Sequence, residues 1–376
     1  MLEVIDARKS LDDFIAFPLV LYSKDPLFVP QLNKEMREHF SQKNPFFKHA
    51  DAGYFLAVKD GRICGRIVAF VNRNHNEFHH DKTGFFGFFD CVNDPSVAGA
   101  LFDKAALYLK EKGMETMRGP MNFSTNEECG FLLEGFDEPP CIMMPYNPLY
   151  YNELSEGYGM MKIKDLFAYI YEVQDELPEK VRRVAAIAEK RGIIARPMNM
   201  KRFKAEMMIF KEVYHSAWEN NWGFIPMTDE ELDYMSARLK QIIIPEMAVI
   251  AEKDGTPVGF MGLVPDFNFV LKHMKGKLNP VSIAKALYYS RKIRDLRTML
   301  LGIKKEFRNQ GVEALLYREG WKPIKRGKYK RVEFSWILED NIPVQRTIEI
   351  FGGRIYKKYR IYEKTLQSFP LSGVKK

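Results

Sequence analysis

The chain has 376 residues, of which 46% are hydrophobic and 28% charged, so it is a globular protein with room for two domains. This composition excludes a mainly disordered chain, a collagen and a disulfide scaffold. The net charge of +8 suits an anionic ligand such as a nucleotide but does not indicate nucleic acid. No apolar run approaches the roughly 18 residues of a membrane span, and the first residues are unlike a signal peptide, so we expect a soluble, cytoplasmic protein.

The cysteines are spaced too irregularly for a metal site or a disulfide framework. We expect buried free thiols, and no metal, at Cys64, Cys91, Cys129 and Cys141. A basic cluster at 322–331 is interpreted as a solvated helix end and turn in preference to a nucleic-acid site.

The first half of the chain predicts strands and helices in a definite order. The elements are a strand at 2–5, a helix at 10–22, a hairpin at 54–70, a strand at 85–92, a helix at 95–112 and a strand at 114–121. Asp60 and Gly61 lie between two β-rich runs, a strong signal for a tight hairpin turn. Pro95 is well placed to begin the helix, and Gly113 to end it.

The second half predicts the same order again. Its elements are a strand at 193–197, helices at 201–218 and from Thr228, a hairpin at 248–264, a strand at 298–303, a helix at 309–324 and a strand at 331–338. Thr228 and Glu231 have the spacing of a capping box, and the hairpin again turns at an Asp-Gly pair. We therefore expect an α/β (α+β) fold of two tandem domains, 1–174 and 175–376, each a mixed twisted sheet flanked by helices. A helix at 179–191 follows the junction.

The halves differ by an insertion at 267–296 in the second. Apolar residues behind Asn279 and Pro280 predict an amphipathic helix there. It is either a packed surface excursion or a lid over a substrate pocket.

One stretch carries the pattern of an anion site. The strand at 298–303 runs into a turn with Arg308 and Gly311, and a helix begins at once. Unpaired backbone N–H groups and the helix dipole suit such a turn to phosphate, Gly311 allows close approach, and Arg308 adds a charged fork.

This stretch resembles motif A of the GNAT (N-acetyltransferase) superfamily, whose loop binds the pyrophosphate of acetyl-CoA. Glu313 stands where the family has Gly or Ala. The segment from 333 to 353 resembles the family's motif B: Asn341 matches, and Ile348 replaces a Tyr that acts as general acid in many members. The resemblance implies that acyl-CoA binds in the second domain, through Leu301, Gly302, Ile303, Arg308, Asn309, Gln310, Gly311, Val312, Glu313 and Asn341.

The first half departs further from the family pattern. Its loop at 93–101 lacks the Arg or Gln, carries an acid at Asp94, and loses a donor at Pro95. We expect this half to bind no CoA and to help shape the substrate site.

The layout of most of the chain resembles a bacterial group of tandem GNAT-like proteins, through segments 85–90, 119–126 and 218–224. The resemblance places the acceptor pocket between the first two helices of the second domain, where Trp218, Asn221 and Trp222 would bind the acceptor or form a buried aromatic corner. Candidate catalytic residues are Tyr356, Asp295 and Glu246: the tyrosine as acid and the carboxylates as bases for an amine.

The sequence thus favours an acyl-CoA-dependent N-acyltransferase, in the first place an acetyltransferase. The acceptor would be an amine on a small molecule, an amino acid or a peptide. One alternative is a non-catalytic tandem binding module. Another is an acyltransferase whose donor is long-chain acyl or aminoacyl-tRNA. The oligomeric state stays open, although 354–362 is predicted to be an edge strand that could pair.

Overall fold

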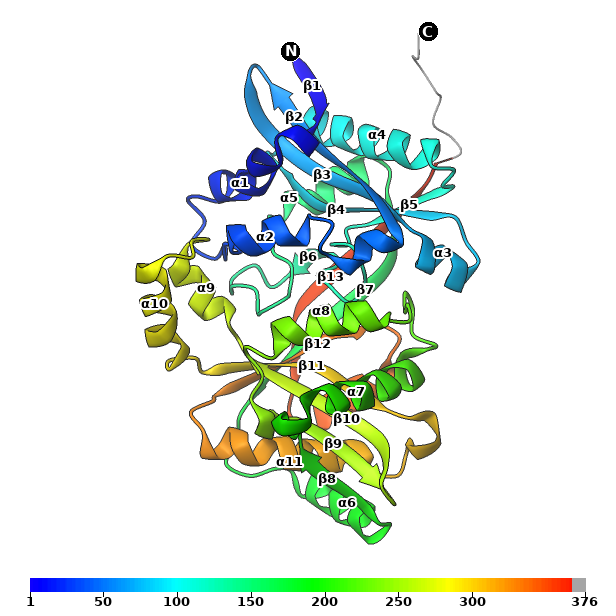
Figure 1. Ribbon diagram of the computed structural model, residues 1–376, viewed down its shortest axis with the longest axis vertical. Coiled ribbons are helices and arrows are strands. Elements are labelled where there is room, and N and C mark those ends of the chain that lie inside the picture. The colour runs from blue at the N-terminus through cyan, green and yellow to red at the C-terminus, as the bar shows by residue number, and fades with distance from the viewer. Residues whose placement is uncertain (367–376) are drawn as a thin grey trace. The chain divides into compact units, whose positions relative to one another are not determined.

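The protein is described by a computed structural model covering residues 1–366, which form two compact units (Figure 1). Unit 1 contains Met1–Leu166, Leu271–Ala286 and the described residues from Lys357. Unit 2 contains Phe167–Val270 and Leu287–Tyr356. The units differ from two consecutive halves because each takes a segment from the other half of the sequence.

Unit 1 begins with a strand and two helices, and a hairpin and an α/β alternation follow. The elements of this part are β1 (Leu2–Asp6), α1 (Leu11–Leu21), α2 (Asn33–His39), β2 (Ala50–Lys59), β3 (Arg62–Asn72), α3 (Arg73–His79), β4 (Thr83–Cys91), α4 (Pro95–Glu111), β5 (Thr116–Gly119), β6 (Phe131–Glu134) and α5 (Tyr150–Gly157). Asp60 and Gly61 both have positive φ, at 51° and 77°, so the predicted tight turn joins β2 to β3.

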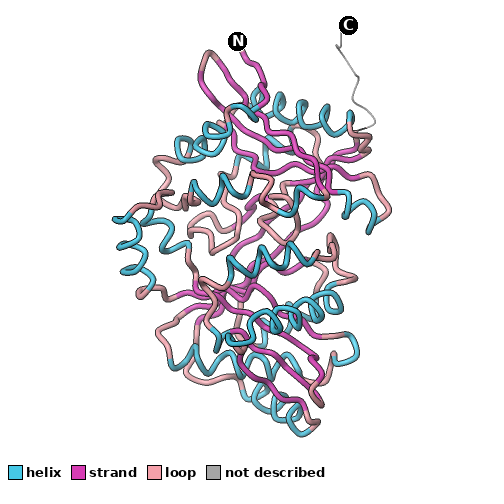
Figure 2. The backbone as a smooth tube through the Cα atoms, viewed as in Figure 1, coloured by secondary structure: helices cyan, strands magenta, loops and turns pink. Residues whose placement is uncertain are grey.

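The sheet of unit 1 is buried on both faces. Its strand order is β1-β2-β3-β4-β5-β13, where β13 is Arg354–Thr365 and β6 pairs with β13. Successive residues of β2 alternate between the faces: Phe55 packs in the core under α4, whereas Tyr54 packs edge-on against Phe14 of α1 and Phe40. The helices and strands of this layering can be followed in Figure 2.

Unit 2 repeats this order. Its elements are β7 (Met161–Glu172, from Phe167), α6 (Glu179–Lys190), β8 (Ile193–Pro197), α7 (Phe203–Trp218), α8 (Asp229–Leu239), β9 (Ala248–Lys253), β10 (Thr256–Pro265), β11 (Asp295–Ile303), α11 (Val312–Arg326), β12 (Arg331–Leu338) and α12 (Ile342–Ile350). The predicted capping box of α8 is present, and Asp254 and Gly255 again form a positive-φ turn. The helix expected from 309 begins only at Val312, because Asn309 and Gly311 have φ of 60° and 85°.

The sheet of unit 2 has the order β8-β9-β10-β11-β12-β7 and a separate core on each face. Val249 and Ala251 of β9 pack in the core with α6 and α11, whereas Ile250 packs with Phe210 of α7. The N-terminus of α11 follows the end of β11 after the loop 304–311, which contains a short 3₁₀ helix (Lys305–Phe307).

Each unit therefore completes its sheet with a strand from the other half of the sequence. Residues 358–365 of β13 pair antiparallel with β5 and β6 in unit 1, so the prediction of an edge strand at 354–362 is wrong. The side chain of Lys357 is buried and donates to the carbonyl oxygens of Gly135 (2.8 Å) and Glu138 (2.7 Å). A basic residue in this strand thus has carbonyl partners inside the fold.

The insertion of the second half forms α9 (Asn268–Met274) and α10 (Pro280–Ser290), so the predicted helix behind Pro280 is present. No helix among residues 1–366 is long and apolar enough to cross a membrane. All four cysteines are buried free thiols.

Candidate active site

Two parallel strands of unit 2 separate part of the way along their length. Strands β11 and β12 pair from Asp295 and Arg331 to Thr298 and Phe334, and within the described chain no further pair follows. Beyond this point, the backbone N–H and C=O groups that β11 would use to pair with β12 are available to a ligand.

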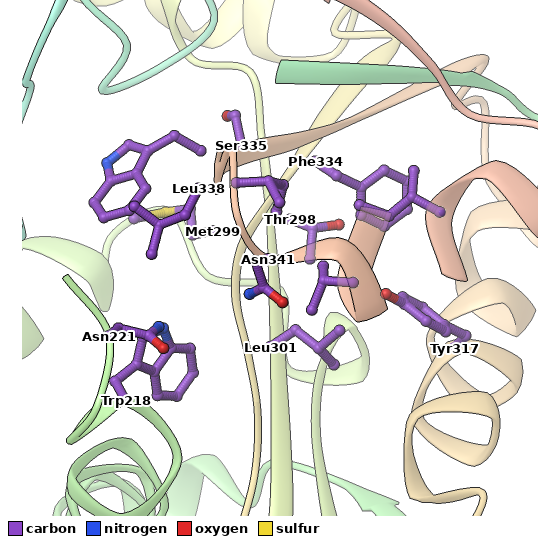
Figure 3. Close-up of a pocket in the computed structure, with 14 residues that line it drawn as sticks. Trp218, Asn221, Thr298, Met299, Leu301, Tyr317, Phe334, Ser335, Leu338 and Asn341 are labelled. Atoms are coloured by element: carbon purple, nitrogen blue, oxygen red, sulfur yellow. The ribbon is translucent and has the colours of Figure 1, made fainter. Parts of the chain in front are cut away.

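A cleft of about 80 Å³ opens between the diverging strands (Figure 3). Most of its wall is apolar or aromatic, and this part includes Trp218, Met299, Leu301, Trp336, Val344 and Ile348. Its polar groups come from Asn221, Thr298, Tyr317, Ser335 and Asn341. A largely apolar cleft with a few converging polar groups is the usual form of a small-molecule site.

Two hydroxyl groups on the wall of this cleft are buried without a hydrogen-bond partner among residues 1–366: Thr298 Oγ1 and Tyr317 OH. Glu313 Oε2, one turn before Tyr317 on α11, is also buried and unpartnered in the described chain. Burial, with the charge of Glu313 adding to it, holds the pKa of Tyr317 well above its ordinary value. Unpaired buried hydroxyls are costly, so their presence here indicates groups that a ligand can satisfy.

The loop after β11 presents an open helix N-terminus. Gly311 is the N-cap of α11 and has no side chain to bond the first-turn N–H groups. A Cβ at this position would lie 2.9 Å from the carbonyl oxygen of Val184 on α6, so glycine is needed for packing as well as for its φ of 85°. Arg308 donates to the carbonyl of Ala217 at 2.9 Å, which holds the loop against the end of α7.

A buried polar network lies where the strands separate. Glu333 and Ser335 of β12 are 2% and 4% exposed, and the Ser335 hydroxyl donates to the Glu333 carboxylate. Arg297 of β11 donates to Ser335 Oγ at 2.9 Å. The hydroxyl of Tyr356 donates to the other carboxylate oxygen of Glu333. Because Ser335 also lines the cleft, it connects the cleft to a buried carboxylate.

The corresponding gap in unit 1 is filled by the chain itself. Strands β4 and β5 pair only from Thr83 to Phe85. A Cβ at Gly87 would lie 1.7 Å from the carbonyl oxygen of Met121, and Asn122 Oδ1 accepts from the N–H of Phe88 at 2.8 Å. The segment after β5 therefore occupies the gap and accepts the hydrogen bond from a backbone N–H that a ligand would otherwise use.

The helix that follows β4 is also closed to anions. Asp94 caps α4 by accepting from the N–H of Ser96 at 2.9 Å, and Lys59 lies 2.6 Å from its other oxygen. The hydrogen bond from Lys59 is the main reason that the pKa of Asp94 lies well below its ordinary value. A fixed carboxylate thus occupies the place where α11 is open.

The residues predicted for acceptor and cofactor are distributed around the cleft and its loop. Trp218, Asn221, Leu301 and Asn341 line the cleft, and Figure 3 shows Trp218 and Asn221 on one side with Tyr317 on the other. The remaining predicted cofactor residues are the backbone of β11 and the loop to α11, namely Gly302, Ile303, Arg308, Asn309, Gln310, Gly311, Val312 and Glu313. A Cβ at Gly302 would lie 2.2 Å from the Trp218 ring, so the indole packs directly on the strand. Trp222 is half-buried in the turn after α7.

The three predicted catalytic residues lie in different places. Tyr356 belongs to the network around Glu333. Asp295 lies at the start of β11 and forms a 2.7 Å ion pair with Arg331. Glu246 is exposed on the short 3₁₀ helix Pro245–Met247 before β9.

Glu333 and Ser335 are not among the site residues predicted from the sequence. The available signal was an acid inside the otherwise apolar run of β12, where a charge needs a specific partner.

Comparison with known proteins gives two close relatives, while no protein-family model matches the chain. Protein YghO of Escherichia coli (strain K12) is 37% identical over 365 residues, which cover 96% of this chain and 94% of that protein. Bacterial ceramide synthase of Caulobacter vibrioides (strain NA1000 / CB15N) is 34% identical over 364 residues, or 95% of both chains.

Solved structures share the fold at low sequence identity. A tandem GNAT protein from the clavulanic acid biosynthesis pathway has a TM-score of 0.57 at 12% identity, covering 97% of this chain and 99% of that one. A GCN5-related N-acetyltransferase from Sphaerobacter thermophilus has a TM-score of 0.55 at 13% identity, covering 97% and 96%. The predicted tandem GNAT-like fold is thus confirmed. Among residues 1–366, no group of three or more His, Cys, Asp or Glu side chains could hold a metal ion.

Proposed function

Since this chain belongs to the bacterial protein family of YghO and bacterial ceramide synthase, we propose that it is an acyl-CoA-dependent N-acyltransferase. Ceramide is the amide of a fatty acid with a long-chain amino alcohol. We therefore propose a long-chain acyl-CoA as donor and the amine of a lipid-like amino alcohol as acceptor. The observation that carries this proposal is the open, largely apolar cleft between β11 and β12, beside an uncapped helix N-terminus.

Donor binding would use the backbone before and after the loop. Leu301, Gly302 and Ile303 would pair with the amides of the pantetheine arm. The N–H groups at the start of α11 would hold the pyrophosphate, with Arg308 nearby. Unit 1 would bind no acyl-CoA, since its own chain fills the matching gap and Asp94 caps the matching helix.

The acceptor would lie on the side of the cleft formed by Trp218 and Asn221, with Trp222 in the same turn. An indole ring offers an apolar surface to a long chain, and the Asn221 amide offers hydrogen bonds to a hydroxyl group.

The proposed reaction is direct attack of the amine nitrogen on the thioester carbonyl carbon. A C–N bond forms, the C–S bond breaks, and the nitrogen loses one proton. The Ser335 hydroxyl would pass this proton to Glu333, which accepts a hydrogen bond from Tyr356 and lies 3.9 Å from the Arg297 guanidinium. This role goes to Glu333 in preference to Asp295 and Glu246, because Glu333 is connected to the cleft through Ser335, whereas Asp295 and Glu246 do not line the cleft.

The thiolate of CoA leaves with the electrons of the C–S bond and takes up one proton. We assign this proton to the Tyr317 hydroxyl, which lines the cleft from α11 and would serve where Ile348 replaces the usual tyrosine. The raised pKa of Tyr317 keeps its hydroxyl protonated at neutral pH, so a proton is present on it when the thiolate leaves.

The test is calorimetric titration with acetyl-CoA and with palmitoyl-CoA. Val344 lines the cleft, so Val344→Trp should block it. Ile187→Trp places the same ring on an exposed position of α6 and is the matched control. Micromolar or tighter binding that is lost in Val344→Trp and kept in Ile187→Trp supports the proposal. Absence of binding by either thioester contradicts it.

Donor length and acceptor are tested by mass spectrometry of the product. We expect the amide of a long-chain amino alcohol to form from palmitoyl-CoA. A clear preference for acetyl-CoA would contradict the long-chain part of the proposal and leave acyl transfer itself standing.

A further inference from the structure

The insertion before β11 has an unusual charge composition. Between Asp266 and Asp295 the sequence contains no Asp or Glu. The same stretch contains seven basic residues: Lys272, Lys275, Lys277, Lys285, Arg291, Lys292 and Arg294. The basic cluster at 322–331 is also free of acids, but the acid-free stretch in the insertion is longer, from 267 to 294, and is a local concentration of positive charge.

Helix α10 in this insertion exposes its apolar side. Val281, Ile283, Leu287 and Tyr288 are 66%, 47%, 62% and 53% exposed. At 100° per residue these four side chains fall on one continuous arc of the helix. The buried position of α10 is a serine, Ser282, whose hydroxyl bonds to the backbone of Asn279. A helix that packs against a core buries its apolar residues and exposes its polar ones, which is the reverse of α10. The apolar face of α10 is therefore available for a partner.

The basic side chains border this apolar face. Lys285 is exposed on α10 itself, and Lys277 is exposed just before the helix. Lys292 follows the helix, with its Nζ 4.1 Å from the centre of the Tyr288 ring and 2.6 Å from its hydroxyl. An apolar face that carries a tyrosine and is bordered by lysines is the composition of helices that lie in a membrane interface.

We propose that α10 is a docking surface for an anionic phospholipid bilayer. The helix lies in the plane of the interface, with Val281, Ile283, Leu287 and Tyr288 at the boundary of headgroups and acyl chains. The lysines contact lipid phosphates. A second copy of this chain fits less well, because it would bring two acid-free basic segments together. The exposed apolar face and the basic charge of the insertion do not depend on the proposed activity.

The experiment is co-sedimentation of the full chain with vesicles. One set of vesicles is phosphatidylcholine, and the other is phosphatidylcholine with about a third phosphatidylglycerol. We expect binding to the anionic vesicles, weaker binding to the neutral ones, and a decrease as salt is raised.

The variants separate the apolar and the charged contributions. Val281→Ser with Leu287→Ser should weaken binding roughly tenfold or more, because two apolar side chains no longer enter the lipid. Lys285→Glu should weaken it at least about fivefold, the effect of one basic residue at an anionic surface. The control is Ile194→Ser, a substitution of a 59% exposed isoleucine on β8, which should leave binding unchanged.

Two results would overturn the proposal. One is equal sedimentation of the wild type and the Val281/Leu287 variant with anionic vesicles. The other is a wild-type dimer in analytical ultracentrifugation that this variant converts to monomer, since a second copy would then cover the face. The same variants are also titrated with acyl-CoA. None of the substituted residues lines the cleft, so acyl-CoA binding should be unchanged, and a failure of vesicle binding then concerns the α10 surface and not the proposed activity.

Discussion

At the scale of single residues, the cleft is marked by polar groups that the protein itself does not satisfy. Thr298 Oγ1 and Tyr317 OH are buried on its wall with no partner in the described part of the chain. An unsatisfied buried hydroxyl costs stability, so retaining it is consistent with a use in ligand binding or catalysis.

The unpartnered hydroxyl of Tyr317 predicts separate effects of Tyr317→Phe on stability and on activity. The substitution removes a hydroxyl that bonds to nothing in the described protein, so the free energy of unfolding should change by less than about 1 kcal/mol. As the proposed acid is lost, kcat should fall by roughly 10²-fold or more. Thermal unfolding and steady-state kinetics measure the two effects. The control is Tyr54→Phe in unit 1, which should leave kcat unchanged. If kcat is also unchanged in Tyr317→Phe, Tyr317 is not the acid of the reaction.

A second prediction at this scale concerns the pH dependence of stability. Burial, with the adjacent His79 adding to it, lowers the pKa of His75 from 6.5 to about 4. The unfolded chain therefore binds this proton at higher pH than the folded chain does. His75 contributes fully to the free energy of unfolding above pH 6.5. As the pH falls toward 4, this contribution decreases by about 3 kcal/mol.

Urea unfolding at pH 7 and pH 4.5 measures this effect by comparison of variants. His75→Gln should lose less stability between the two values than the wild type does. His80→Gln, which changes an exposed histidine, should behave like the wild type. Equal losses in all three proteins would show that His75 titrates normally.

At the scale of elements, the two units differ at one helix N-terminus. In unit 1, Asp94 caps α4, whereas in unit 2 Gly311 leaves the start of α11 open. The sequence predicts this difference directly, because both residues stand at equivalent places after a strand.

The open N-terminus predicts different effects for Gly311→Asn and Gly311→Asp. Both side chains have the same shape, tolerate the left-handed conformation and meet the same carbonyl of Val184, so they should destabilise the protein equally. Only Asp adds a negative charge at the proposed pyrophosphate site. We expect palmitoyl-CoA to bind about tenfold more weakly to Gly311→Asp than to Gly311→Asn, with a smaller difference at high salt. Equal affinities would place the pyrophosphate elsewhere.

Many elements could be predicted from the sequence because their signals are local. The Asp-Gly turns, the capping box at Thr228 and the bounds of β8 and β12 depend on residues close together in the chain. The network at Glu333 could not be predicted, because its partners Arg297 and Tyr356 come from other strands. The filling of the gap in unit 1 by Met121 also depends on contacts that no local pattern records.

At the scale of the whole molecule, the units do not coincide with the halves of the sequence. The predicted boundary between 174 and 175 falls in the loop after β7, but residues of β7 from Phe167 are in unit 2 and those of β13 from Lys357 are in unit 1. The alternation of apolar and polar residues in a strand does not specify which sheet the strand joins. The exchange of strands between the units could therefore not be predicted from the sequence.

The exchange predicts that the end of the chain stabilises its beginning. A chain that ends at Tyr356 lacks the segment that pairs with β5 and β6, and the buried Lys357 and Tyr362 with it. Unit 1 of this protein should be unfolded or readily cleaved in limited proteolysis. A chain that ends at Leu366 keeps all of β13 and should resist cleavage like the full chain. Equal resistance of both truncated chains would contradict the prediction.

Strand β13 also sets an order of events during synthesis. The residues of β5 leave the ribosome long before 362–365, their partners in the sheet. Until then, the edge of β5 has no strand of its own chain to pair with, and an unpaired edge can bind other chains. The part of the protein that is made first is therefore the part that finishes folding last. The position of this single strand therefore requires that β5 be protected in the nascent chain. A chaperone or rapid translation of the second half would provide this protection.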